Sequence, residues 1–125
     1  MTKCLKNSQM VDMLNQLRPI LSHRDKLGYI AARNYRMLAD TLTEYNAFKH
    51  DLINKYGAPD KDENGEDLGT VSIKFGSPNF KAFCDELAPF NEIEHEVDIM
   101  TAKYDDTIGS LSGEEILMLD WMLED

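Results

Sequence analysis

The feature that most constrains this chain is a long helical segment between about residues 24 and 56. Apolar side chains recur along it at spacings of three and four, the period of one helix face. This seam consists of Ala31, Tyr35, Leu38, Leu42, Tyr45, Leu52 and Tyr56, with Phe48 beside it. Gly57 and Pro59 are residues that end a helix. The rest of the chain is therefore expected to cover this seam.

A second helical pattern over residues 7–21 supplies the natural partner. Its apolar face is formed by Met10, Met13, Leu14, Leu17 and Leu21. Pro19 lacks an amide hydrogen and should end or kink this helix near Leu17–Arg18. We therefore predict a helical hairpin over residues 1–57.

Residues 58–69 read as an acidic loop, because they combine turn-forming residues with many carboxylates. Residues 70–75 alternate in polarity, which predicts a strand with Val71, Ile73 and Phe75 on its buried side. Ser77 and Pro78 resemble the cap and first residue of a short helix that ends before Pro89. Residues 93–100 alternate again, with Glu94, Glu96 and Asp98 on the outer face. Together these segments predict a β-α-β element over residues 70–100, whose strand direction the sequence leaves open.

The C-terminal residues 110–125 are expected to form a helix. Ser112 and Glu115 match a capping box, in which each side chain bonds the other's backbone amide. Trp121 lies off the apolar stripe, so it is either a lid over the hairpin or part of a partner surface. The fold class is thus α+β, in a single domain over residues 1–125: a long helical hairpin, a small two-stranded β-α-β element and a C-terminal helix.

Charge is distributed unevenly along the chain. Residues 1–36 contain seven basic and two acidic residues, whereas residues 37–125 contain six basic and 21 acidic ones. Such asymmetry can steer association with basic or bipolar surfaces. It disfavours direct nucleic-acid binding by the acidic part, because phosphates would be repelled. The absence of a long apolar run argues against a membrane span.

Two acidic clusters are candidate partner-binding residues. The first is in the loop and comprises Asp60, Asp62, Glu63, Glu66 and Asp67; the second comprises Glu94, Glu96 and Asp98. The loop begins like a calcium-binding loop, but Val71 stands where a bidentate carboxylate is needed. The strand carboxylates lack the lysine that a metal-dependent nuclease would place beside them. We therefore interpret both clusters as solvated acidic surfaces without metal.

A secondary basic patch is formed by Arg24, Lys26, Arg33 and Arg36. One hypothesis is that these residues contact nucleic acid while the acidic part sets the orientation. No exposed aromatic residues are interleaved with them in a recognisable module. A helix surface with internally paired charges is the simpler interpretation.

The sequence contains no recognisable catalytic or cofactor motif. His23, His50 and His95 are far apart in sequence, and no nucleophile elbow or phosphate-binding glycine loop is present. Cys4 and Cys84 are expected to be packing thiols of a reduced cytosolic protein. We therefore expect no enzymatic activity and no cofactor.

Several short motifs occur in an order that resembles a known family. They are LINKYG at 52–57, the D-x-DENG loop at 60–65, the pair Phe80 and Phe83, EVDI at 96–99 and LSGEEILMLDWMLE at 111–124. In this order they are similar to small proteins of phages and prophages of Gram-positive bacteria, the domain of unknown function number 1617. The resemblance covers about Leu27 to the end of the chain. It implies phage origin and action in the bacterial host cytoplasm or in the virion, and it carries no catalytic residues.

The resemblance and the charge together give two functional hypotheses. The first is a non-enzymatic protein-interaction module that inhibits a host defence nuclease, of the anti-CRISPR or anti-restriction type. Its acidic surface would occupy a basic nucleic-acid channel of the partner. The alternative is a virion structural or assembly accessory protein, for which homo-oligomers are expected. In both cases the partner is a host or phage protein, and for the first hypothesis its surface is basic.

Overall fold

The computed structural model describes residues 1–125 and combines helices with three small two-stranded sheets, as expected of the α+β class. The chain forms two compact units. The terminal unit contains Met1–Leu42 and Glu94–Asp125, and the central unit contains Thr43–Ile93. Each unit is described by itself below.

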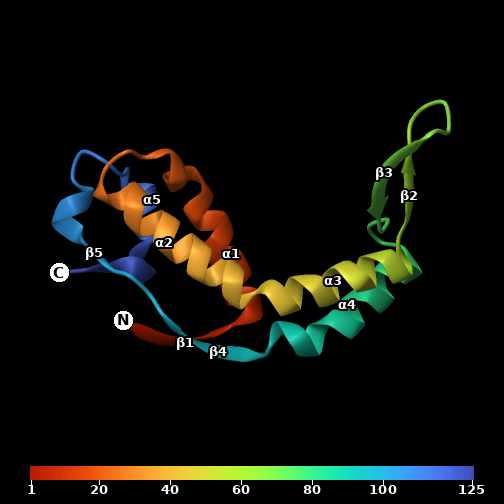
Figure 1. Cartoon of the computed structure of the whole chain (residues 1–125), viewed down its shortest axis with the longest axis horizontal. Helices are drawn as coiled ribbons and strands as arrows, with labels where there is room; N and C mark the ends of the chain where they lie inside the picture. The colour runs from red at the N-terminus through yellow and green to blue at the C-terminus, as the bar shows by residue number, and fades with distance from the viewer. The chain divides into compact units, whose positions relative to one another are not determined.

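A helical hairpin is the centre of the terminal unit (Figure 1). Helix α1 (Asn7–Leu17) leads into the 3-10 helix η1 (Arg18–Ser22), and helix α2 (Lys26–Thr41) then packs against both. The predicted end of the first helix at Leu17–Arg18 is confirmed, and Pro19 lies in the first turn of η1. The fully buried side chains include Met10, Leu17, Ile20, Leu27 and Leu38.

The predicted single helix over residues 24–56 is wrong, because it is interrupted at Leu42. Helix α2 ends at Thr41, and helix α3 (Thr43–Tyr56) belongs to the central unit. The φ and ψ angles of Leu42 are −87° and 2°, outside the helical range. The Thr41 hydroxyl donates to the carbonyl of Met37 at 2.8 Å, a side-chain bond that bends helices. The hairpin therefore involves α1 and α2 alone rather than residues 1–57, whereas the predicted helix end at Gly57 is confirmed, since α3 ends at Tyr56.

Strands β1 (Thr2–Lys6) and β4 (Glu94–Asp98) form an antiparallel pair in the terminal unit. The predicted strand at residues 93–100 is confirmed over these five residues, and Val97 and Ile99 point into the core. Its partner was predicted at residues 70–75, which is wrong. The segment TKCLK, for which no strand was predicted, provides the pairing instead. The predicted β-α-β element therefore does not form.

The helix in the C-terminal segment is shorter than predicted. Helix α5 (Gly113–Met118) is followed by the 3-10 helix η3 (Asp120–Met122) and strand β6 (Leu123–Glu124). The Ser112–Glu115 capping box is confirmed. Strand β6 pairs in parallel with β5 (Ala102–Lys103), which the 3-10 helix η2 (Tyr104–Thr107) follows. The predicted continuous helix over residues 110–125 is thus wrong after Met118.

Trp121 lies against the hairpin rather than free in solvent. Its ring Nε1 donates a hydrogen bond to the Gln16 Oε1 of α1 at 2.9 Å, and the residue is half-buried. Of the two interpretations of Trp121, this contact favours the lid over the hairpin.

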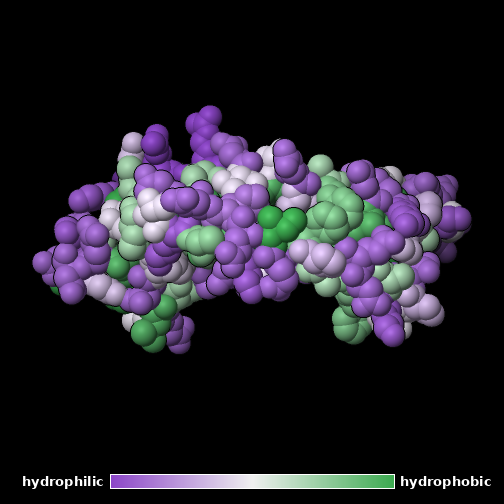
Figure 2. Space-filling view, turned by 90° about the horizontal axis from the view of Figure 1, so that it is seen from below, coloured by the Kyte–Doolittle hydropathy of each residue, from purple (hydrophilic) through white to green (hydrophobic).

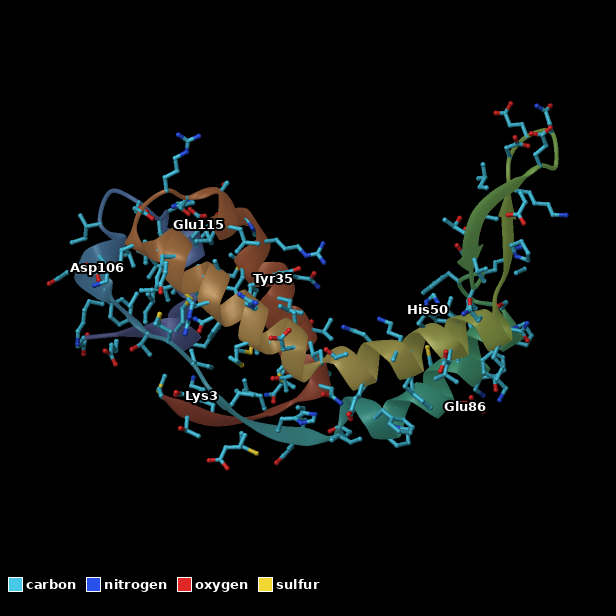
Figure 3. All side chains as sticks on the ribbon, viewed as in Figure 1. Lys3, Tyr35, His50, Glu86, Asp106 and Glu115 are labelled. Carbon is cyan, nitrogen blue, oxygen red and sulfur yellow. The ribbon has the colours of Figure 1, made fainter.

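The central unit consists of α3, the hairpin of β2 (Ala58–Lys61) and β3 (Asp67–Ser72), and helix α4 (Pro78–Asn91). The two helices pack side by side, as Figure 1 shows, and bury Tyr45, Leu52, Phe83 and Leu87. Glu86 of α4, which is labelled in Figure 3, accepts a hydrogen bond from Lys55 of α3 at 3.2 Å. The Ser77 cap and Pro78 start of α4 are confirmed, whereas the helix continues past Pro89 to Asn91.

The predicted acidic loop at residues 58–69 is largely an antiparallel hairpin. Residues 62–66 make its tight turn, where Gly65 has a φ of +79°, a backbone conformation that favours glycine. Every residue of β3 is exposed, so the predicted burial of Val71 is wrong, and Phe75 is 85% exposed. A two-stranded hairpin without a covering layer has no side on which to bury Val71, and Phe75 lies beyond the end of β3.

Both cysteines are exposed, so the expectation that they are packing thiols is wrong. Cys84 lies at the border of the apolar stripe of α4, whose buried positions are Phe83 and Leu87. The three-residue and four-residue spacings of the apolar residues in α4 are compatible with either a buried or an exposed side chain at position 84.

Candidate interaction surface

The β1–β4 sheet carries the clearest row of predicted partner-binding residues. Met1 and Ile99 each donate a backbone hydrogen bond to the other's carbonyl, both at 2.8 Å. In an antiparallel ladder such reciprocal pairs alternate with pairs that have no hydrogen bonds. From the register, Lys3–Val97 and Leu5–His95 are bonded pairs, and Thr2–Asp98, Cys4–Glu96 and Lys6–Glu94 are not.

The two faces of this sheet are therefore chemically different. The bonded positions point inward, where Val97 is buried and Leu5 and His95 are half-buried. The unbonded positions point outward and place Glu94, Glu96 and Asp98 in one exposed row. The predicted acidic outer face is confirmed as the exposed face of this strand.

Two of the three carboxylates in this row have a neighbour on β1 or at the N-terminus. Glu94 accepts from the Cys4 thiol at 3.0 Å, which raises the pKa of that thiol. Asp98 pairs with the Met1 ammonium at 3.1 Å, and its side chain is 84% exposed. No ion pair or side-chain hydrogen bond involves the Glu96 carboxylate, so it is free to meet a partner's cation.

Some carboxylates of the β2–β3 hairpin accept hydrogen bonds from within the hairpin, and others make no such bond. Asp60 accepts from the hydroxyls of Thr70 and Ser72, each at 2.7 Å, and these bonds lower the pKa of Asp60. Asp62 accepts from the amides of Asn64 and Glu66, each at 2.9 Å. These contacts stabilise the hairpin and its turn.

Asp67 likewise accepts from the amide of Gly69 at 2.9 Å. The side chains of Glu63 and Glu66 are exposed and make no such bond. Of the five predicted loop residues, these two glutamates present the freest charge. Asp60 and Asp62, the first two aspartates of the pattern that resembles a calcium site, accept hydrogen bonds that stabilise the hairpin and its turn. This structural function explains why they occur at that spacing.

The two acidic clusters belong to different units. The hairpin cluster lies in the central unit, and the β4 row lies in the terminal unit. The structure groups the predicted residues into two separate sets, each organised by its own strand pair. The sequence spacing gives no indication of this division, since both clusters lie in the same acidic part of the chain.

The predicted basic patch lies in the terminal unit and is only partly free. Lys26 pairs with Asp106 of η2, which is labelled in Figure 3, at 3.2 Å. Arg33 and Arg36 form no ion pair and line a shallow groove on α2 with Met37, Asp40 and Thr41. Arg24 directly precedes Asp25, the N-cap of α2, and is exposed.

One serine, one histidine and one aspartate come together at the start of α2. Ser110 Oγ donates to Asp25 Oδ2 at 2.5 Å and lies 3.2 Å from His23 Nδ1. Asp25 is also the N-cap and accepts from the Gly28 amide at 3.2 Å. The hydroxyl proton thus points at a carboxylate rather than at the imidazole, the reverse of the arrangement that activates a nucleophile. The cluster attaches the 108–112 segment to the start of α2.

The sequence reasoning missed β1, which completes the acidic sheet. The residues of TKCLK do not alternate in polarity, because inward Lys3 and outward Cys4 both break the pattern. The segment also continues directly into α1 at Asn7, so the sequence gives no signal for this strand.

The comparisons with known proteins found no match: no protein-family model, no curated protein and no solved structure is significantly similar to this chain. None of its helices has the length and apolar character that crossing a membrane requires.

Proposed function

We propose that this protein is a non-enzymatic protein-interaction module that binds a basic surface through its β4 carboxylates. The observation that carries the proposal is the exposed row of Glu94, Glu96 and Asp98 on a sheet whose opposite face is packed. A strand holds these side chains about 7 Å apart, at every second residue. A fixed row of carboxylates at this spacing suits a surface on which Lys and Arg side chains normally contact phosphates.

Within this proposal the partner is a host defence nuclease, of the CRISPR or restriction type. The resemblance to phage proteins motivates that choice, together with the excess of acidic residues in both units. The terminal unit has 13 acidic and eight basic residues, and the central unit has ten and five. Each unit is therefore negative, which favours fast, salt-sensitive association with a basic channel. The free glutamates of the β2–β3 hairpin, Glu63 and Glu66, form a second acidic surface that belongs to the central unit.

The test is binding to purified nuclease complexes of a Gram-positive host, measured at about 50 and about 300 mM salt. We expect the double variant Glu94→Lys, Glu96→Lys to lose at least tenfold in affinity. The matched control is Asp12→Lys, Asp51→Lys, which changes the net charge equally at two other exposed helix positions. Equal losses in both variants would show a general charge effect and contradict the proposed surface, as would binding that is indifferent to salt.

The alternative proposal is a virion structural or assembly accessory protein. Exposed apolar side chains of the central unit favour it: Phe75 is 85% exposed and lies 5.0 Å from the Phe80 ring, and Leu68 is 58% exposed. Figure 2 shows hydrophobic patches between hydrophilic side chains on one face of the molecule. Apolar surface of this kind suits contacts between subunits.

Sedimentation of the purified protein and mass spectrometry of phage particles distinguish this alternative. A stable oligomer that Phe75→Ser disrupts, with the protein present in particles, would support an assembly function. A monomer absent from particles would contradict it.

A further inference from the structure

The backbone edge of β4 is open. Glu94, Glu96 and Asp98 occupy unbonded positions of the β1–β4 ladder, so their N–H and C=O groups point away from β1. The sheet has no third strand, and no other hydrogen bond reaches these backbone groups. The same three residues thus present both an unpaired strand edge and a row of carboxylates.

The edge is closed at one end by a side chain. Met100 is the next residue in the series Glu94, Glu96 and Asp98, whose backbone groups point away from β1. The side chain of Asn34 of α2 forms hydrogen bonds with both backbone groups of Met100. The Asn34 amide donates to the Met100 carbonyl at 2.9 Å and accepts from the Met100 N–H at 2.8 Å. These are the two bonds that a neighbouring strand would make. Asn34 is 1% exposed, so this substitute for a strand is fixed.

Space is present next to the last open position. A groove of about 440 Å³ is lined by Arg33, Asn34 and Met37 of α2, by Met1 and by residues 98–101. The corresponding edge of β1 is less available, because the Lys6 amide bonds the Gln9 side chain at 2.8 Å and α1 follows directly. The β4 edge is therefore the better place for an additional strand.

We propose that a partner binds by adding an extended segment as a third strand along β4, with Lys or Arg at alternate positions. This inference rests on the proposed function and specifies how its β4 surface binds. Backbone hydrogen bonds to Glu94, Glu96 and Asp98 supply the pairing, as in other cases of strand addition. The basic side chains fall opposite the three carboxylates, and opposite charges across strands stabilise the pair.

The experiment uses the full chain and synthetic peptides of about nine residues in which lysine alternates with valine. Two versions carry N-methyl groups on alternate residues, one set at the lysines and the other at the valines. In an added strand, only the N–H groups of alternate residues face β4, and N-methylation removes those hydrogen-bond donors. One methylated peptide should therefore lose at least tenfold in affinity, and the other should bind with nearly the affinity of the unmethylated parent peptide. Amide exchange followed by NMR should show new protection at Glu94, Glu96 and Asp98.

Charge is tested separately with Glu96→Gln, which should weaken binding of the parent peptide by about two- to fivefold. The control Asp12→Asn should leave the affinity unchanged. If both methylated peptides bind equally while Glu96→Gln weakens binding, strand addition is wrong and the electrostatic surface of the proposed function stands. No binding of any peptide overturns the inference, and the nuclease measurements described above then decide on the proposed function independently.

Amide exchange of the free protein checks the premise. Val97 should exchange slowly and Glu96 and Asp98 rapidly, because only the Val97 amide faces β1. Slow exchange at Glu96 in the absence of peptide would mean that the edge is already covered, and it would overturn the inference.

Discussion

At the scale of single residues, Asn34 shows how a helical sequence can terminate a sheet edge. It lies within the buried stripe of α2, beside Ala31 and Leu38. An amide has both a donor and an acceptor, so it can satisfy the N–H and C=O of one strand residue at once. No apolar side chain could do this, and the backbone of Met100 would then lack both partners.

We predict that Asn34→Ala lowers the free energy of unfolding by about 2–4 kcal/mol, because two part-buried backbone groups of Met100 lose their partners. Urea denaturation followed by circular dichroism measures the change. The control is Asn15→Ala on the exposed side of α1, which should shift stability by less than about 0.5 kcal/mol. Similar small effects of both substitutions would contradict the strand-like function of Asn34.

At the scale of elements, the start of α2 is defined by its cap. Asp25 accepts from the Gly28 amide and from the Ser110 hydroxyl. The bond from Ser110 contributes most to lowering the pKa of Asp25, followed by the Gly28 amide and the charge of His23. Gly28 itself is required, because an added Cβ would lie 2.0 Å from the carbonyl oxygen of His23. Local sequence and a distant loop thus determine this helix end together.

The lowered pKa of Asp25 gives the expected pH dependence. A carboxylate with a lower pKa in the folded state stabilises the protein above its unfolded pKa of about 3.9, and this contribution is lost as the pH falls through the folded-state pKa. Asp25→Asn keeps a good cap and removes the charge. The urea midpoints of the two proteins should differ most between about pH 5 and 7, and this difference should shrink as the pH falls below about 3.9.

The matched control is Asp12→Asn, at an exposed carboxylate of α1 that makes no hydrogen bond or ion pair. The difference in urea midpoint between Asp12→Asn and the original protein should vary little with pH. If the Asp25→Asn difference stays constant down to pH 3, then the charge of Asp25 does not stabilise the folded chain.

At the scale of the whole molecule, the two units differ in how well their elements are covered. The terminal unit buries α2 along its length, including Leu27, Ile30, Ala31 and Leu38. In the central unit all residues of β3 are exposed. Local opening requires little free energy where few apolar side chains are buried.

We therefore predict a gradient of amide protection in hydrogen exchange. Amides in the middle of α2 should exchange at least about 100-fold more slowly than those of β2 and β3. Helices α3 and α4 should be intermediate, since each buries only two side chains. Mass spectrometry of exchanged peptides measures all three classes in one sample. Equal protection of β3 and α2 would show that the hairpin is covered by contacts absent from this structure.

The sequence predicted those features that depend on neighbours close along the chain. The hairpin of α1 and α2, the caps at Ser77 and Ser112, and the alternating strand at residues 94–98 all follow from spacings of two to four residues. The eight predicted acidic partner-binding residues were identified from charge alone. Six of the eight are exposed, because a carboxylate is rarely buried without a partner, and the half-buried Asp60 and Asp62 have hydrogen-bond partners within the hairpin.

The tertiary structure alone decided which strand pairs with which. Alternation in residues 70–75 and 94–98 is equally compatible with pairing between the two. In the structure residues 70–72 belong to β3 and pair with β2, whereas residues 94–98 pair with β1. The break at Leu42 likewise cannot be read from a seam whose spacing continues through it. Periodicity determines which face of an element is apolar, whereas pairing depends on contacts between distant segments. The open edge of β4 and its closure by Asn34 arise only from those contacts.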